Sequence, residues 1–370
     1  MLLCNTIKEA DGMHLWIGGD LVPTKENSAL FAAGDTQALF GEEFLSLWKD
    51  ADARILNLET VLADEGTPIT KAGPNLRADT ACAAALQKLD LTAVCLANNH
   101  IFDFGAEGLE STQAVLGNTP HFGAGSNLHE ASQALWLGDT AVYACAEREF
   151  SAAGESTPGA NPFDPLTSFD HVEALAKKAQ RVIVLYHGGL EKYRYPTPNL
   201  QRICRKFAEK GASLVICQHS HTVGCMEMYA GGTIIYGQGN LLFSRYRDEH
   251  WRSGLLIGVD TETMELSFVP LEQTECGVRV SHDENILAGF RARSQEILQP
   301  GFVENAFRQR ARQADYEKKL FGRLGRYVRK LKMTERLMDR RSAAGVINLF
   351  ECDTHRELAA EMLRLKYVDR

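Results

Sequence analysis

The sequence predicts an α/β fold followed by a helical extension. Across the first 260 residues, short apolar strand-like runs alternate with helix-like segments, which is typical of a sheet covered by helices. From about residue 284 the apolar spacing is helical only. The net charge of −8 also divides unevenly, because residues 306–341 carry thirteen Lys or Arg against four Asp or Glu. We therefore expect two domains, residues 1–283 and 284–370, that meet different partners.

The strand-like and helix-like segments can be placed along the chain from their apolar runs and turn residues. The strongest buried strand is 181–187, and residues 199–210 form a basic amphipathic helix that stops at Gly211. A long loop is expected at 151–165, which is rich in Gly, Pro, Ser and Asn. The other expected strands are 15–18, 54–59, 91–97 and 213–217, with strand–turn–strand segments at 134–145, 226–240 and 255–270; the other expected helices are 80–89, 105–116, 170–179, 284–299, 302–320, 324–341 and 354–366.

The composition is that of a globular protein, with 45% hydrophobic and 24% charged residues. No stretch approaches the roughly 18 apolar residues of a membrane span. The first eleven residues hold a lysine and two acids where a signal peptide would have its apolar core, so we expect a cytoplasmic protein. Nine scattered cysteines without a CxxC pair favour reduced, buried thiols.

Polar side chains gather at the expected carboxyl ends of five strands, the edge where ligands bind in an open α/β sheet. A single histidine or carboxylate there is more often structural, but five successive strand ends favour a shared site. Oxygen and imidazole groups without thiolates suit Mn, Zn, Fe or Mg. The residues are Asp20, Asn57, Glu59, Asn98, Asn99, His100, Asp103, His187, Glu191, His219 and His221.

Two features of the histidines bear on chemistry. On an extended strand His219 and His221 would point to the same side and reach one metal, or two metals about 3.5–4 Å apart, while Ser220 points away. A surface turn with two histidines is the alternative. His100 follows Asn99 directly, so it can face a substrate and protonate a leaving oxygen if Asn99 binds metal. Its alternative role is to cap the following helix.

Five blocks in this order resemble the bacterial CapA family, also called poly-γ-glutamate biosynthesis proteins, of the calcineurin-like metallophosphoesterase superfamily. The resemblance covers roughly residues 14–260 and leaves the helical C-terminal third unmatched. It implies a four-layer α/β/β/α sandwich with a metal centre between the loop edges of two sheets. The blocks are IGGDLVP (17–23), ILNLETVL (55–62), LANNHIFDFGAEGL (96–109), HGGLEKYRYPTPNLQRICRKFAEKGASLVICQHSHTV (187–223) and YAGGTIIYGQGNLLFS (229–244).

The resemblance also implies roles for single residues. His100 resembles the catalytic histidine, and Glu59 takes the place of the acid that bridges two metal positions. The other implied ligands of one or two divalent ions are Asp20, Asn99, His187, His219 and His221; Glu191, Asn240 and Asn57 are expected to bind substrate.

Two departures from the superfamily pattern stand out. Val22 occupies the place of a histidine, and Glu59 the place of an aspartate. One metal position therefore lacks a ligand, which Glu191 can help to supply, and a mononuclear centre or a weak second site is expected. Members of the family often carry an N-terminal membrane anchor, and none is expected here.

Two functions remain open. One is a metal-dependent phosphoesterase acting on a phosphorylated precursor, or a lipid-linked intermediate, of a surface polymer. The other is a non-catalytic accessory subunit of a polymer-synthesis complex, which keeps the fold with or without one metal. The chain has no GxxxxGK[ST] loop and no GxSxG elbow, so neither P-loop nor serine-hydrolase chemistry is expected.

The basic segment 306–341 also contains aromatic residues. The first expectation is a solvated helix face. An anionic membrane at the inner face, an anionic polymer or a partner protein comes next, and nucleic acid is the weakest alternative.

Overall fold

The computed structural model describes residues 12–244, 247–313 and 324–333, together with 342, 343, 346, 347, 350 and 363. Internal contacts group the chain into two compact units, Met1–Ala306 and Phe307–Arg370. The expected domain boundary after residue 283 stays a prediction; helix α9 (Glu284–Glu296) packs on strand β13 (Val223–Tyr229) in the first unit.

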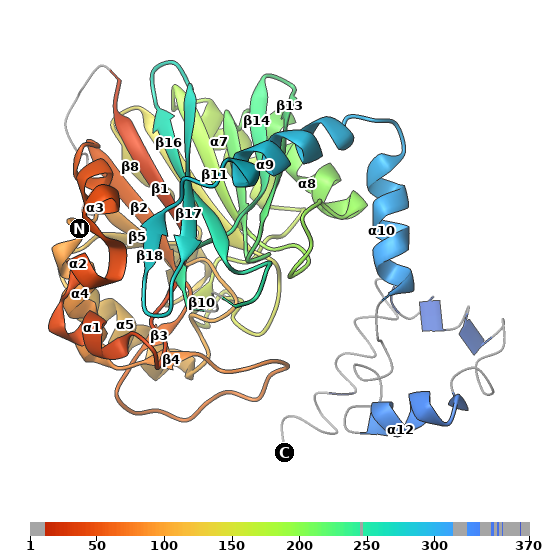
Figure 1. Cartoon of the computed structure of the whole chain (residues 1–370), viewed down its shortest axis with the longest axis horizontal. Coiled ribbons are helices and arrows are strands. Elements are labelled where there is room, and N and C mark those ends of the chain that lie inside the picture. Colours follow the sequence, from red (N-terminus) through yellow and green to blue (C-terminus); the bar gives the residue numbers. More distant parts are fainter. Residues whose placement is uncertain are drawn as a thin grey trace. The chain divides into compact units, whose positions relative to one another are not determined.

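The first unit contains two large sheets, so the α/β class is confirmed (Figure 1). The eight-stranded sheet has the order β18-β17-β16-β1-β2-β5-β6, with β15 also paired to β1. The six-stranded sheet has the order β13-β14-β12-β11-β9-β8. The strands of the first are β1 (His14–Val22), β2 (Ala53–Leu58), β5 (Ala93–Cys95), β6 (His121–Phe122), β15 (Asn240–Phe243), β16 (Ser253–Asp260), β17 (Leu266–Gln273) and β18 (Val278–Val280); those of the second are β8 (Leu135–Leu137), β9 (Thr140–Ala146), β11 (Arg181–His187), β12 (Leu214–Gln218), β13 and β14 (Gly232–Gln238).

The helices of the first unit fall into two groups, one for each sheet. Figure 1 shows the first group on the side of β1 and β2, and α8 beside β13 and β14. The first group is α1 (Ser28–Ala33), α2 (Thr36–Phe40), α3 (Glu42–Lys49), α4 (Ala83–Lys88) and α5 (Gly105–Leu116); α7 (Ser168–Ala176) and α8 (Pro198–Glu209) belong to the other sheet. Smaller elements are η1 (Thr80–Cys82), α6 (Leu128–Ala131), β3 (Val61–Leu62) paired with β4 (Arg77–Ala78), and β7 (Ala124–Gly125) paired with β10 (Gly159–Ala160).

Three apolar cores hold these elements together. The first packs Phe44 and Trp48 of α3, with residues of α1, α2, α4 and α5, against the eight-stranded sheet. The second combines residues of both sheets, such as Ile17 of β1 and Ile183 of β11. The third packs Phe207 of α8 and residues of α7 against the six-stranded sheet. Burial on both faces explains why the central strands are nearly continuous in apolar residues.

The main predicted strands and helices of the first unit are present, whereas three short helices were not predicted. The strong strand at 181–187, the helix at 105–116 and all three strand–turn–strand segments are present. Helices α1 to α3 were not predicted, because five to eight residues are too few for a clear helical period. In the C-terminal part, α10 (Phe302–Arg312) and α12 (Gly325–Lys330) lie within predicted helices; residues 314–320 and 334–341 of those helices, and nearly all of 354–366, lie outside the described residues.

The described cysteines are free thiols, and all but Cys276 are buried. Burial raises the pKa of the Cys95 thiol to about 12, which makes this sulfur a poor nucleophile. No helix in the described ranges is both long and apolar enough to cross a membrane.

The N-terminus of α8 offers a test of local stability. Thr197 accepts a hydrogen bond from the Leu200 amide, whereas Thr167 at the start of α7 makes no such side-chain contact. Thr197→Ala should lower the free energy of unfolding by about 1 kcal/mol, and Thr167→Ala by much less. Chemical denaturation of the two variants checks this, and equal losses would contradict it.

Candidate metal centre

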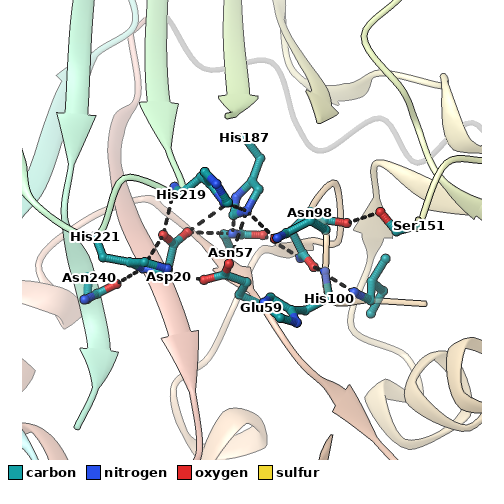
Figure 2. A network of polar contacts seen from close by, with 12 residues as sticks. Asp20, Asn57, Glu59, Asn98, His100, Ser151, His187, His219, His221 and Asn240 are labelled. Carbon is teal, nitrogen blue, oxygen red and sulfur yellow. Dashed lines mark hydrogen bonds and ion pairs between the residues drawn. The ribbon is translucent and has the colours of Figure 1, made fainter. Parts of the chain in front are cut away.

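Most of the predicted site residues meet where strands of the two sheets end (Figure 2). Asp20 lies in β1, Glu59 follows β2, and Asn99 follows β5, so the eight-stranded sheet supplies these oxygen-bearing side chains. His187 ends β11, and His219 and His221 follow β12, so the six-stranded sheet supplies the imidazoles. The site is therefore assembled from residues far apart in the sequence.

The first group of side chains surrounds Nε2 of His187. Asn99 Oδ1 lies 3.0 Å from this nitrogen, and His219 Nδ1 and Glu59 Oε1 each lie 3.2 Å from it. One imidazole nitrogen carries either one hydrogen or one lone pair, so it cannot bond all three. Such convergence of donor atoms is what a metal-ligand set requires. Glu59, His187 and His219 form one of the residue groups suited to a metal ion.

The second group consists of Asp20, Glu59 and His221, and shares Glu59 with the first. His221 Nδ1 lies 3.6 Å from Asp20 Oδ2 and 3.9 Å from Glu59 Oε2. The distances are longer than in the first group, and His221 is the one imidazole in this set of three. The backbone amide of His219 donates to Asp20 Oδ2 at 3.0 Å. The first group therefore offers four donor side chains and the second offers three, with Glu59 common to both. We call the second, Asp20, Glu59 and His221, the sparse group.

Glu59 provides the test of whether these residues fit a metal. Both of its carboxylate oxygens are buried, and neither has a hydrogen-bond partner among the described residues. An unpaired buried carboxylate is costly unless a cation or proton compensates it. Oxygen and imidazole donors lie on both sides of it, so the donor set fits one or two divalent cations.

The pKa shifts have the directions expected of a buried centre without a compensating cation. Burial, with a smaller effect of Glu59, raises the pKa of Asp20 to about 7. Burial likewise raises the pKa of Glu59 to about 8. Burial lowers the pKa of His187, and burial together with the neighbouring His187 and His221 lowers that of His219. A lowered pKa favours the neutral form of the His187 and His219 imidazoles, which is the form that binds metals.

A layer of amides holds these side chains in place. Asn57 Nδ2 donates to Asp20 Oδ1 at 2.7 Å and lies 3.2 Å from His187 Nδ1. Asn98 donates to Asn57 Oδ1, and its own Oδ1 accepts from the amides of His100 and Ile101. Asn57 is fully buried, so its contacts support an orienting role; its expected contact with substrate stays a prediction.

The close approach of β1 and β15 brings Asn240 beside the site. A Cβ atom on Gly19 would lie 2.2 Å from the Gly239 carbonyl oxygen, so this pairing requires glycine. Asn240 Oδ1 lies 2.8 Å from His221 Nδ1, and its buried Nδ2 has no partner in the described part of the chain. Glu191 is exposed and belongs to neither group, although its charge contributes to raising the pKa of Glu59 after the larger effect of burial. The predicted substrate contacts of both residues remain predictions.

The geometry of the His-x-His turn differs from the expected one. Strand β12 ends at Gln218, and both His219 (φ 85°) and His221 (φ 53°) have left-handed backbones. The expectation that strand alternation orients the two histidines is therefore wrong. A turn with a strained backbone places His219 in the first group and His221 in the second. Such conformations are uncommon outside glycine and cluster at functional sites. Ser220 points away as expected, toward the Thr222 carbonyl oxygen.

His100 does not cap the following helix. Helix α5 begins at Gly105 after Phe104, and His100 Nδ1 instead lies 2.6 Å from Asp103 Oδ2. Figure 2 shows His100 close to Glu59, at the edge of the site. A buried carboxylate that fixes an imidazole ring is a common feature of catalytic histidines.

Sequence reasoning missed two residues that contact the site. Lys71, from the loop between β3 and β4, contacts Asp103 and the Asn99 carbonyl oxygen. Trp251 stacks on His221 with ring centroids 3.8 Å apart, and packs with Val22 and Phe243 in a small apolar cluster. Neither lies at a strand end, so the pattern that located the ligands gave no signal for them.

Trp251 should act on the sparse group through His221. Trp251→Leu removes the ring stack, and we expect affinity for a metal at this group to fall about 10-fold, the lower end for residues that orient ligands. Trp251→Phe should retain most of it. Titration of each variant with Mn²⁺ checks this, and equal affinities in both would contradict it.

The chain belongs to the bacterial capsule synthesis protein PGA_cap family, whose sequence pattern matches residues 14–245. This confirms the resemblance drawn from the five blocks, and places the chain in a family concerned with capsule and poly-glutamate biosynthesis.

The chain spans about half the length of the curated relatives that it matches. The PGA biosynthesis protein CapA of Bacillus subtilis (strain 168) is 28% identical over 175 residues, 45% of this chain and 45% of that protein. The capsule biosynthesis protein CapA of Bacillus anthracis is 26% identical over 239 residues, 58% of this chain and 56% of that protein. A probable polyglutamine synthesis accessory protein of Mycobacterium tuberculosis is 28% identical over 211 residues, 52% of this chain and 55% of that protein.

Similarity to solved structures is weak. The crystal structure of TT1561 of Thermus thermophilus aligns with a TM-score of 0.37 and 13% identity, over 70% of this chain and 98% of that chain. This level of likeness supports no inference about fold or function.

Proposed function

We propose that the protein is a metal-dependent phosphoesterase that acts on a phosphorylated precursor in capsule, poly-γ-glutamate or other surface-polymer biosynthesis. The observation that carries the proposal is the buried Glu59 carboxylate, which has no hydrogen-bond partner in the described ranges and lies between two sets of ligand-type side chains. We infer the four-layer sandwich of the superfamily from the three cores.

The chemistry divides between the metal and the chain. Bound divalent ions would polarise the phosphoryl oxygens and supply hydroxide near neutral pH. Glu59, Asn99, His187 and His219 would hold one ion, and Asp20, Glu59 and His221 a second; Mn, Zn, Fe and Mg suit this donor set.

The chain's own part in the reaction is to orient the substrate and move a proton. His100, fixed by Asp103, would donate a proton from Nε2 to the leaving oxygen as the P–O bond breaks. Asn240 Nδ2 is a buried donor without a partner in the described part of the chain, and would bind a phosphoryl oxygen.

A substrate screen tests this function. Metal-loaded protein should hydrolyse phosphomonoesters or diesters, and His221→Ala should reduce the rate and the metal content together. Arg252→Ala, which changes an exposed guanidinium paired with Glu272, serves as the control that keeps both. Failure of the metal-loaded wild type to hydrolyse either ester class would rule the proposal out.

A second function is favoured by one observation. Val22 takes the place of the superfamily's first-block histidine, and it packs with Phe243 and Trp251 instead of presenting a ligand. The sparse group could then remain empty and the chain could serve as an accessory subunit, as the name of the mycobacterial relative suggests for that protein. A folded wild type that binds one metal but hydrolyses no ester would favour this role.

A further inference from the structure

The segment between β3 and β4, residues 63–76, forms a long loop without regular secondary structure (Figure 1). Its ends are joined, because β3 pairs with β4 and the Ala63 amide donates to the Ala78 carbonyl oxygen. Between them most residues are exposed, whereas Ile69, Lys71, Asn75 and Leu76 are half-buried. We call this segment the strap.

Several points of the strap are attached to Asp103, and Asp64 at the start of the strap accepts hydrogen bonds from Thr80. The Ile69 amide and Asn75 Nδ2 each donate to the Asp103 carbonyl oxygen at 3.0 Å. The Leu76 amide donates to Asp103 Oδ2 at 2.6 Å, and Lys71 Nζ forms an ion pair with Oδ1. Four contacts from different points of the strap thus converge on one residue.

The same carboxylate fixes His100. Asp103 Oδ2 lies 2.6 Å from His100 Nδ1, and Lys71 Nζ lies 3.2 Å from that nitrogen. An ammonium group only donates, and Nδ1 has a single position for a hydrogen or a lone pair. The arrangement is self-consistent when Nδ1–H donates to Asp103 and Lys71 neutralises the carboxylate, which leaves Nε2 for the substrate.

The Lys71 side chain is buried, and burying its charge is energetically unfavourable unless it is paired. The Lys71 side chain is 2% exposed and that of Asp103 0% exposed. Ordering a lysine and removing its charge from water is unfavourable unless the ion pair and hydrogen bonds compensate. A strap needed only to connect β3 with β4 would leave such a residue in solvent.

The strap also reaches the sparse metal group. Leu76 packs against the cluster of Val22, Phe243 and Trp251, and Trp251 stacks on His221. Lys71 in turn bonds the carbonyl oxygen of Asn99, an expected ligand of the other group. The strap therefore contacts the Trp251 cluster beside the sparse group and the Asn99 backbone of the first group.

Resting on the phosphoesterase proposal, we propose that Lys71 is a positioning residue. By pairing with Asp103 it locks the strap against the site and holds the Asp103–His100 pair and the Asn99 backbone in their working arrangement. Lys71 acts through these neighbours and not by contact with the reacting atoms.

The test compares Lys71→Met with Lys71→Arg in the full, metal-loaded chain. Lys71→Met keeps the chain length but removes the charge, and should lower kcat about 10- to 100-fold with KM nearly unchanged. Lys71→Arg should restore much of kcat. Thr70→Ala, the exposed neighbour on the strap, is the matched control and should behave like wild type.

A second measurement is independent of activity. Amide deuterium exchange at Ile69 and Leu76 should speed up in Lys71→Met and in Asp103→Asn, and stay slow in Thr70→Ala. Unchanged exchange in Lys71→Met overturns the proposal, as does faster exchange with wild-type kcat. If wild type proves inactive, the phosphoesterase proposal fails, and exchange alone still decides whether Lys71 locks the strap.

Discussion

Glu59→Gln should abolish high-affinity metal binding and lower phosphoesterase kcat/KM by at least about 100-fold. The residue is the only one common to both candidate groups among the described residues, so a neutral amide weakens two metal positions at once. A metal in such a site contributes several kcal/mol of transition-state stabilisation, and each 1.36 kcal/mol corresponds to a factor of ten. Metal content by mass spectrometry and steady-state kinetics measure the two effects.

The same substitution separates a metal-binding role from a structural one. In metal-free protein the amide replaces a buried carboxylate that has no hydrogen-bond partner in the described ranges, so stability should not fall. The rise in melting temperature that added metal gives the wild type should disappear. Glu110→Gln, an exposed carboxylate on α5 outside both groups, should keep metal content and that rise. A destabilised metal-free Glu59→Gln that still binds metal would contradict the account.

His100→Ala should lower kcat by about 10²- to 10⁴-fold while leaving metal content unchanged, because a general acid acts only in the reaction step. The loss should be largest for alkyl phosphates, whose leaving oxygen needs a proton, and smaller for aryl phosphates with acidic leaving groups. Steady-state rates on a matched alkyl and aryl pair measure this difference.

His129→Ala, an exposed histidine on α6, is the control and should keep wild-type rates on both esters. Equal losses on the alkyl and aryl esters in His100→Ala would show that His100 does not donate the proton. Loss of metal from the variant would instead place His100 among the ligands.

The residues of the candidate site could be grouped from the sequence because they obey a simple topological rule. Asp20, Glu59, His187 and His219 each lie in or directly after a strand, and parallel strands place their carboxyl ends at one edge. The family blocks then joined the separate strand ends into a single centre. Neither argument needs a side-chain contact, so both work without a structure.

The parts that escaped prediction depend on contacts between distant loops. Lys71 is one lysine in an exposed loop, and only its pairing with Asp103 distinguishes it. Trp251 belongs to the site because its ring stacks on His221, and no local sequence pattern predicts that contact. The turn at His219 and His221 was mistaken for strand geometry, because β12 ends one residue before the first histidine and a positive φ leaves no trace in hydropathy.

The measurement that bears most directly on the central claim is the metal content of the purified, folded chain after removal and return of divalent ions. The account predicts one tightly bound ion, held with Glu59, His187 and His219, and a weaker second ion that is lost in His221→Ala. A folded wild type that binds no divalent ion at all would contradict the claim that these side chains form a metal centre.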